Sequence, residues 1–171
     1  MIKISVDNKK IKETITIDPY IPIDVKWEHW DEVLENTKYC RFGDFKHSLL
    51  EIGVGSISGQ IRTLTLVEVK EIDIGKSKYS LKTPICKFGV PILNAAGWIG
   101  LNKLDVNCKL SVSTFESELL IFLGDSEPVK YFQSGRIIFG VDESNILCRI
   151  IVYKLTIDEI NDLNNSLRQM R

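Results

Sequence analysis

A succession of short, strand-like segments is the feature of this sequence that most constrains its fold. In the second half of the chain, segments rich in branched and aromatic residues are separated by connectors of turn-forming residues. These segments are Cys108–Thr114, Glu118–Leu123, Val129–Phe132, Arg136–Val141 and Ile146–Leu155. Branched and aromatic residues pack well on a pleated surface, so the spacing predicts an antiparallel meander. We expect the meander to curl into a barrel or a two-layer sandwich.

Two β-hairpins are predicted in the first half of the chain. Segments Lys3–Val6 and Ile11–Ile17 flank the turn-forming residues 7–10. In the second arm three isoleucines and Glu13 alternate with one Lys and two Thr. That alternation is typical of a strand with one face in water. A second hairpin, within Ser48–Ile72, surrounds the glycine- and serine-rich residues 55–59.

Two helices are expected, one after the first hairpin and one at the end of the chain. In Trp27–Asn36, two tryptophans, a valine and a leucine recur at three- and four-residue spacing, with carboxylates opposite them. A closing helix begins after Thr156, because Glu159 has the spacing of a capping box. Residues 75–107 are expected to be irregular, with at most a short helical turn. The prediction is one α+β domain over residues 1–171, mostly antiparallel sheet.

Composition excludes several classes of function. The chain has 22 basic and 23 acidic residues, so no overall positive field marks a nucleic-acid binder. Its apolar runs are too short or too broken to span a bilayer, and the N-terminus has no secretory signal. We therefore expect a cytoplasmic protein whose four scattered cysteines are free thiols.

No enzymatic motif is recognisable in the sequence. The chain has two histidines, His29 and His47, and neither lies in a catalytic or metal-binding spacing. A nucleophile and base made of Cys40 and His47 is the one candidate dyad, and it has no flanking motif. The sequence predicts a protein that is not an enzyme, with no catalytic residues, metal ligands or cofactor.

Acidic residues supply the candidate partner contacts. Residues 116–127 carry four carboxylates and no basic residue, and the predicted first helix adds more. Gathered in space, they would form a patch that steers a basic partner; dispersed, they would only be solubilising. The candidate contacts are Glu28, Asp31, Glu32, Glu116, Glu118, Asp125 and Glu127.

Three segments resemble bacterial immunity proteins, which are encoded beside polymorphic or contact-dependent growth-inhibition toxins. They are the hairpin LEIGVGSISGQIRTLTLV (50–67), the segment GRIIFGVDESN (135–145) and the helix start LTIDEI (155–160). The resemblance implies a cytoplasmic protein that binds the C-terminal toxin domain of its own system and blocks the active site. Many such toxins are nucleases with basic clefts, which an acidic patch would fit. The alternative is a small β-barrel that binds an apolar ligand.

Overall fold

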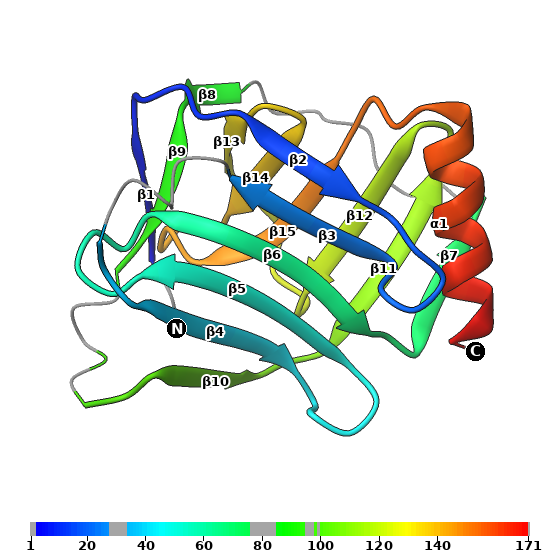
Figure 1. Ribbon diagram of the computed structural model, residues 1–171, viewed down its shortest axis with the longest axis horizontal. Helices are drawn as coiled ribbons and strands as arrows, with labels where there is room; N and C mark the ends of the chain where they lie inside the picture. The colour runs from blue at the N-terminus through cyan, green and yellow to red at the C-terminus, as the bar shows by residue number, and fades with distance from the viewer. Residues whose placement is uncertain (1–2, 28–33, 76–84, 95–97, 99, 171) are drawn as a thin grey trace.

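Strands form most of the structure, and one helix follows them. The computed structural model describes residues 3–27, 34–75, 85–94, 98 and 100–170 (Figure 1). The elements are β1 (Ile4–Asp7), β2 (Glu13–Thr16), β3 (Ile23–Trp27), β4 (Thr37–Gly43), β5 (Leu49–Gly55), β6 (Ile61–Glu68), β7 (Glu71–Ile74), β8 (Ile85–Phe88), β9 (Val90–Leu93), β10 (Lys103–Asn107), β11 (Leu110–Phe115), β12 (Glu118–Leu123), β13 (Lys130–Ser134), β14 (Ile137–Val141), β15 (Leu147–Val152) and α1 (Ile157–Gln169).

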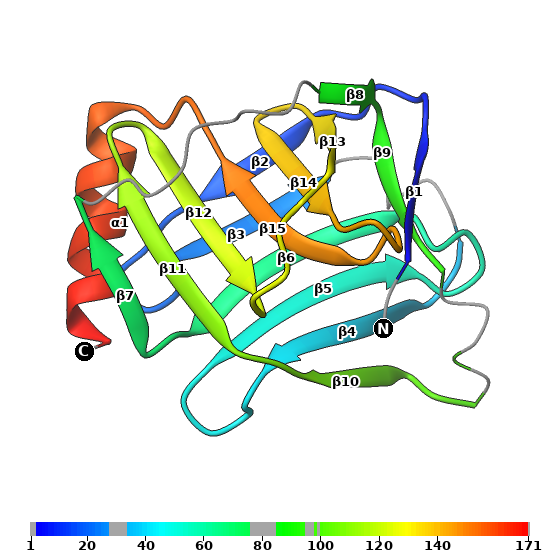
Figure 2. The ribbon, with the colours of Figure 1, turned by 180° about the vertical axis from the view of Figure 1, so that it is seen from behind.

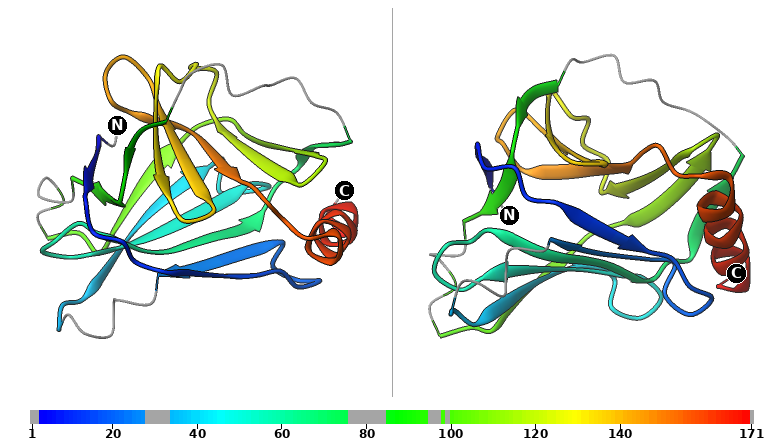
Figure 3. Two further views of the ribbon diagram at one scale, coloured as in Figure 1. Left: turned by 90° about the horizontal axis from the view of Figure 1, so that it is seen from above. Right: turned by 45° about the horizontal axis from the view of Figure 1, so that its top comes forward.

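Two large sheets face each other as layers. One has six strands in the order β10-β4-β5-β6-β3-β2, and the other has seven in the order β7-β11-β12-β15-β14-β13-β8. Strands β1 and β9 form a short separate pair at one end (Figure 2). The sheets are not closed into a barrel, and Figure 3 shows the two layers from above and from an inclined direction. The predicted mostly-sheet α+β class is confirmed, and the barrel is wrong.

The core fills the space between the two sheets. Strand β3 alternates, so that Ile23, Val25 and Trp27 are buried while Lys26 is exposed. Trp27 reaches the opposite sheet: its ring lies 6.2 Å from that of Phe139, and its indole N–H donates to Ser134 Oγ at 2.9 Å. Buried residues of both sheets form one continuous apolar cluster, so burial of this shared core stabilises the layers together.

Helix α1 closes one end of the layers (Figure 1). Thr156 caps it as predicted: the Thr156 hydroxyl accepts from the Glu159 N–H at 3.2 Å, and the Glu159 carboxylate accepts from the Thr156 N–H at 2.8 Å. Leu163 and Leu167 point into the core and are fully buried. No helix in the described part of the chain is long and apolar enough to cross a membrane.

The first predicted hairpin is wrong in its pairing. Strand β1 pairs with β9, and β2 pairs antiparallel with β3. Residues 11–17 do alternate in exposure as predicted, but β3 offers β2 a longer apolar neighbour than β1 does. The second hairpin is confirmed as β5 and β6, although its second arm ends at Glu68 and β7 joins the other sheet.

The predicted helix over Trp27–Asn36 is wrong at both described ends. Trp27 ends β3, residues 34–36 have no regular structure, and residues 28–33 lie outside the described part. Leu34, expected on the buried face, is fully exposed. Ile23, Val25 and Trp27 alternate with the two-residue period of a strand. Trp27 therefore belongs to β3, and the helix predicted to begin at this residue is wrong.

Strand pairing differs from the predicted meander. In a meander β12 would pair with β13, but it pairs with β15. The chain therefore passes the positions of β15 and β14 to reach β13, and then returns through β14 to β15. Residues 75–107, expected to be irregular, include β8, β9 and β10. Strands β7, β8 and β10 each pair in parallel with a strand distant in sequence, namely β11, β13 and β4.

Candidate functional site

The outer face of the six-stranded sheet carries aromatic and charged side chains near strands β4 and β10. Along β4, Cys40 and Phe42 are buried in the core, so the alternating residues Tyr39 and Arg41 lie on the outer face. In the strand register, Arg41 stands opposite Asp105 of β10. This register places an arginine, its acidic neighbour and a tyrosine on one open surface.

Arg41 and Asp105 form a two-pronged ion pair. Arg41 Nε donates to Asp105 Oδ1 at 2.7 Å, and Arg41 Nη2 donates to Oδ2 at 2.6 Å. The hydrogen bond from Arg41 lowers the pKa of Asp105, and its charge acts in the same direction. The side chains are 23% and 42% exposed, so the pair fixes the guanidinium while leaving it accessible to a partner.

The loop after β4 holds an aromatic ring beside this ion pair. Phe45 has a left-handed φ of 59°, and its ring centroid lies 5.5 Å from Arg41 Cζ. Asp44 Oδ1 accepts the backbone N–H groups of Lys46, His47 and Ser48 at 2.8–3.0 Å. These hydrogen bonds hold the pKa of Asp44 well below its usual range. The loop is thus pre-formed, with Phe45 38% exposed.

Tyr39 completes the surface. Its ring lies over Gly53 of β5: a Cβ atom placed on this glycine would be 3.4 Å from Tyr39 Cε1. The tyrosine is 38% exposed and packs over the glycine, which lacks a side chain of its own. We call Tyr39, Arg41, Phe45 and Asp105 the aromatic–arginine surface.

The sequence did not lead us to this surface, although two signals were present. Residues 39–42 alternate between inward and outward side chains over too short a run to be recognised as a strand. Asp44 followed four residues later by Ser48 is typical turn chemistry. The pairing with Asp105, 64 residues away along the chain, comes from a parallel register that no local pattern encodes.

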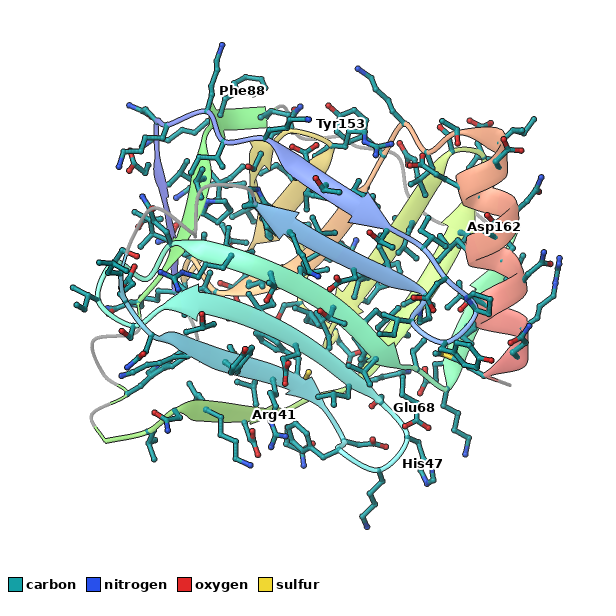
Figure 4. The ribbon with its side chains drawn as sticks, in the orientation of Figure 1. Arg41, His47, Glu68, Phe88, Tyr153 and Asp162 are labelled. Carbon is teal, nitrogen blue, oxygen red and sulfur yellow. The ribbon has the colours of Figure 1, made fainter. Side chains whose placement is uncertain are left out.

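The Cys40 and His47 pair does not form a reactive dyad. Cys40 is fully buried in the core, and burial raises the pKa of its thiol. His47 is exposed on the loop after β4, at the lower rim of the molecule in Figure 4. A buried neutral thiol with no access to an exposed imidazole cannot serve as a nucleophile. Among the described residues, no group of His, Cys, Asp and Glu is placed to hold a metal ion.

The predicted acidic contacts are divided between two places. Glu116 and Glu118 lie at the β11–β12 turn, while Asp125 and Glu127 follow the other end of β12, roughly 17 Å away along a six-residue strand. Glu28, Asp31 and Glu32 lie outside the described residues.

The two acidic pairs also differ in their electrostatic surroundings. Burial, together with the neighbouring charge of Glu116, raises the pKa of Glu118. Glu127 Oε2 lies 3.5 Å from Nη2 of Arg149, a residue of β15, the strand that pairs with β12. The described acidic residues therefore do not gather into one patch.

Glu35 is one of the carboxylates of the predicted first helix, and its side chain is almost fully buried. Its carboxylate pairs with Arg62 of β6, and the two side chains are 3% and 5% exposed respectively. It stabilises the fold and is not available to a partner.

Comparisons with known proteins do not assign a family. No protein-family model matches the sequence, and no curated protein is significantly similar to it.

Proposed function

We propose that this protein is an immunity protein that binds a cognate toxin domain in the cytoplasm and neutralises it by covering its active site. The aromatic–arginine surface is the observation that carries the proposal. Tyr and Arg are enriched among the residues that dominate binding energy at protein interfaces, and exposed Phe supplies apolar contact area. On this proposal the protein acts by association and uses no reactive group of its own.

The rigidity of the surface supports this function. The ion pair to Asp105 fixes Arg41, and the Asp44 hydrogen bonds fix the loop that carries Phe45. Side chains that are already ordered lose less conformational entropy on binding, so more of the contact energy appears as affinity. The surface also adjoins the β5–β6 hairpin, which is the longest of the segments that resemble immunity proteins.

The acidic residues are proposed as further contacts. Many toxins of these systems are nucleases, and a basic substrate cleft is attracted to carboxylates. A standard interface covers about 800 Å² on each partner, which is wide enough to include one end of β12 together with neighbouring loops. Because the two acidic pairs lie at opposite ends of β12, one standard interface would include either Glu116 with Glu118 or Asp125 with Glu127.

Co-expression with the toxin domain encoded immediately upstream tests the proposal. We expect the wild-type chain to restore growth and to co-purify with the toxin domain at a one-to-one ratio. Phe45→Ala and Arg41→Ala should each weaken binding by roughly tenfold or more, the effect typical of a central interface residue. Ile57→Ala is the matched control, because Ile57 is an 88% exposed apolar residue beyond the opposite end of β5. The proposal fails if a toxic neighbour exists and the chain neither binds it nor protects the cell.

A further inference from the structure

A groove lies at the opposite edge of the molecule from the aromatic–arginine surface. It encloses about 480 Å³ between the segment that leads into β2, the β8–β9 junction and the β13–β14 turn. Figure 4 shows Phe88 at the upper edge and Arg41 near the lower edge. The groove brings together three segments that are distant in sequence, so no local pattern predicts it.

Lysines dominate the charge of the groove. Lys9, Lys10 and Lys12 line it, and Glu13 is the one acidic residue among its lining residues. Glu13 Oε1 already accepts the backbone N–H of Arg136 at 2.7 Å, and Lys9 Nζ lies 3.6 Å from Asp7 Oδ2. The net charge of the whole chain is −1, so the positive excess here is a local property.

An exposed aromatic residue lines the same groove. Phe88 ends strand β8 and is 60% exposed, so its ring offers apolar contact area to a bound molecule. Its backbone stands opposite Gln133 in the strand register, and the Gln133 amide donates to Gly135 O at 3.0 Å. The groove therefore has a fixed polar floor, a cationic side and an apolar side.

Two sheet edges border the groove. Among the described strands, β8 pairs with β13 alone and β2 pairs with β3 alone. An edge strand presents backbone N–H and C=O groups that an extended peptide can pair with, while neighbouring side chains provide specificity.

We infer that this groove binds an extended acidic peptide segment that carries one apolar side chain. Its carboxylates would face Lys10 and Lys12, and its apolar side chain would cover Phe88. A peptide fits better than a nucleic acid, because the lining is short, has no arginine, and is bordered by sheet edges that pair with an extended peptide backbone. The inference extends the proposed function by giving the protein partner a second docking point.

Binding of synthetic peptides tests the inference without the toxin. The probe is a library of fluorescent nonapeptides with three glutamates and one phenylalanine at varied positions, measured by fluorescence anisotropy. We expect saturable binding that weakens as salt is raised from 0.05 to 0.5 M, because screening shortens the reach of the lysine charges. Replacing the phenylalanine of the peptide by alanine, or its glutamates by lysines, should abolish binding.

Variants of the protein locate the site. Lys10→Glu and Lys12→Glu should each weaken peptide binding roughly three- to tenfold, and Phe88→Ala roughly tenfold. Lys70→Glu is the matched control, since it makes the same charge change at an exposed lysine between β6 and β7 and should leave affinity unchanged.

Three results would overturn the inference. They are no saturable binding by any library member, equal weakening by Lys70→Glu, or tighter Lys10-dependent binding of a nine-nucleotide RNA. None of them depends on whether the toxin domain is bound, so failure here is distinguishable from failure of the proposed function.

Discussion

Arg62 Nη2 lies 3.1 Å from Glu35 Oε1, in an ion pair whose two side chains are almost fully buried. The other Glu35 oxygen accepts the backbone N–H groups of Ile57 at 2.6 Å and Ser58 at 3.0 Å. Arg62 also donates to Thr37 Oγ1 at 3.0 Å. Burial by itself raises the pKa of Glu35, but the hydrogen bonds from Ser58 and Ile57 and the Arg62 charge outweigh burial and lower it. The pair thus ties the β5–β6 turn to the start of β4, the strand that carries the aromatic–arginine surface.

Removing one partner of this ion pair should destabilise the protein strongly. Glu35→Gln or Arg62→Met leaves the remaining group buried without its counter-charge, at a cost of about 3–5 kcal/mol in the free energy of unfolding. Chemical denaturation followed by circular dichroism measures this cost. Lys26→Met is the control, because it breaks an exposed pair with Asp24 and should change stability little. Equal effects at the two sites would contradict the structural role of Glu35.

The loop that carries Phe45 should lose stability in acid. The folded pKa of Asp44 is lowered from its ordinary value of 3.8, so the ionised carboxylate stabilises the loop fully above that pH. The stabilisation is lost as the pH falls through the lowered folded pKa. Asp44→Asn keeps an acceptor oxygen but cannot ionise. The difference in thermal midpoint between wild type and Asp44→Asn should therefore narrow from pH 5 to pH 2, and a constant difference would contradict the account.

Cys40 should behave as a core residue. Burial raises the pKa of its thiol, while Cys108 is only half-buried. Alkylation with iodoacetamide at pH 8, followed by peptide mapping, should label Cys108 well before Cys40. Cys40→Ala should leave toxin binding unchanged, because the side chain faces the core. Two results would instead support a reactive dyad of Cys40 and His47. They are rapid labelling of Cys40, or a Cys40→Ala variant that is folded but no longer neutralises the toxin.

Local chemistry made some elements predictable and left others hidden. The β5–β6 hairpin and the Thr156 cap depend on neighbouring residues, so the sequence was enough to find them. Strand β1 pairs with β9 across more than eighty residues, and Asp105 meets Arg41 through a parallel register, so no local pattern showed either contact. Trp27 was assigned to a helix because its spacing to Trp30 and Val33 fits the helical period. It also continues the two-residue alternation of Ile23 and Val25, and its packing against the opposite sheet shows that it belongs to the strand.

The capping box of α1 should contribute measurably to stability. Thr156→Ala removes the acceptor for the Glu159 N–H and should cost about 1 kcal/mol, whereas Thr156→Ser keeps the hydroxyl and should cost little. Thermal denaturation of the three proteins measures the difference. If alanine and serine gave the same midpoint, the cap would contribute nothing to the fold.

Stoichiometric titration of the purified toxin domain tests the central claim most directly. Increasing amounts of this protein are added to a fixed amount of toxin, and the remaining toxin activity is followed over time. Inhibition by binding predicts that activity falls linearly, reaches zero at a one-to-one ratio and does not change further on incubation. Arg41→Ala should shift the curve to excess protein, and Ile57→Ala should not. Progressive loss of activity at substoichiometric protein would mean catalytic inactivation, and no loss at any ratio would mean that the toxin is not the partner.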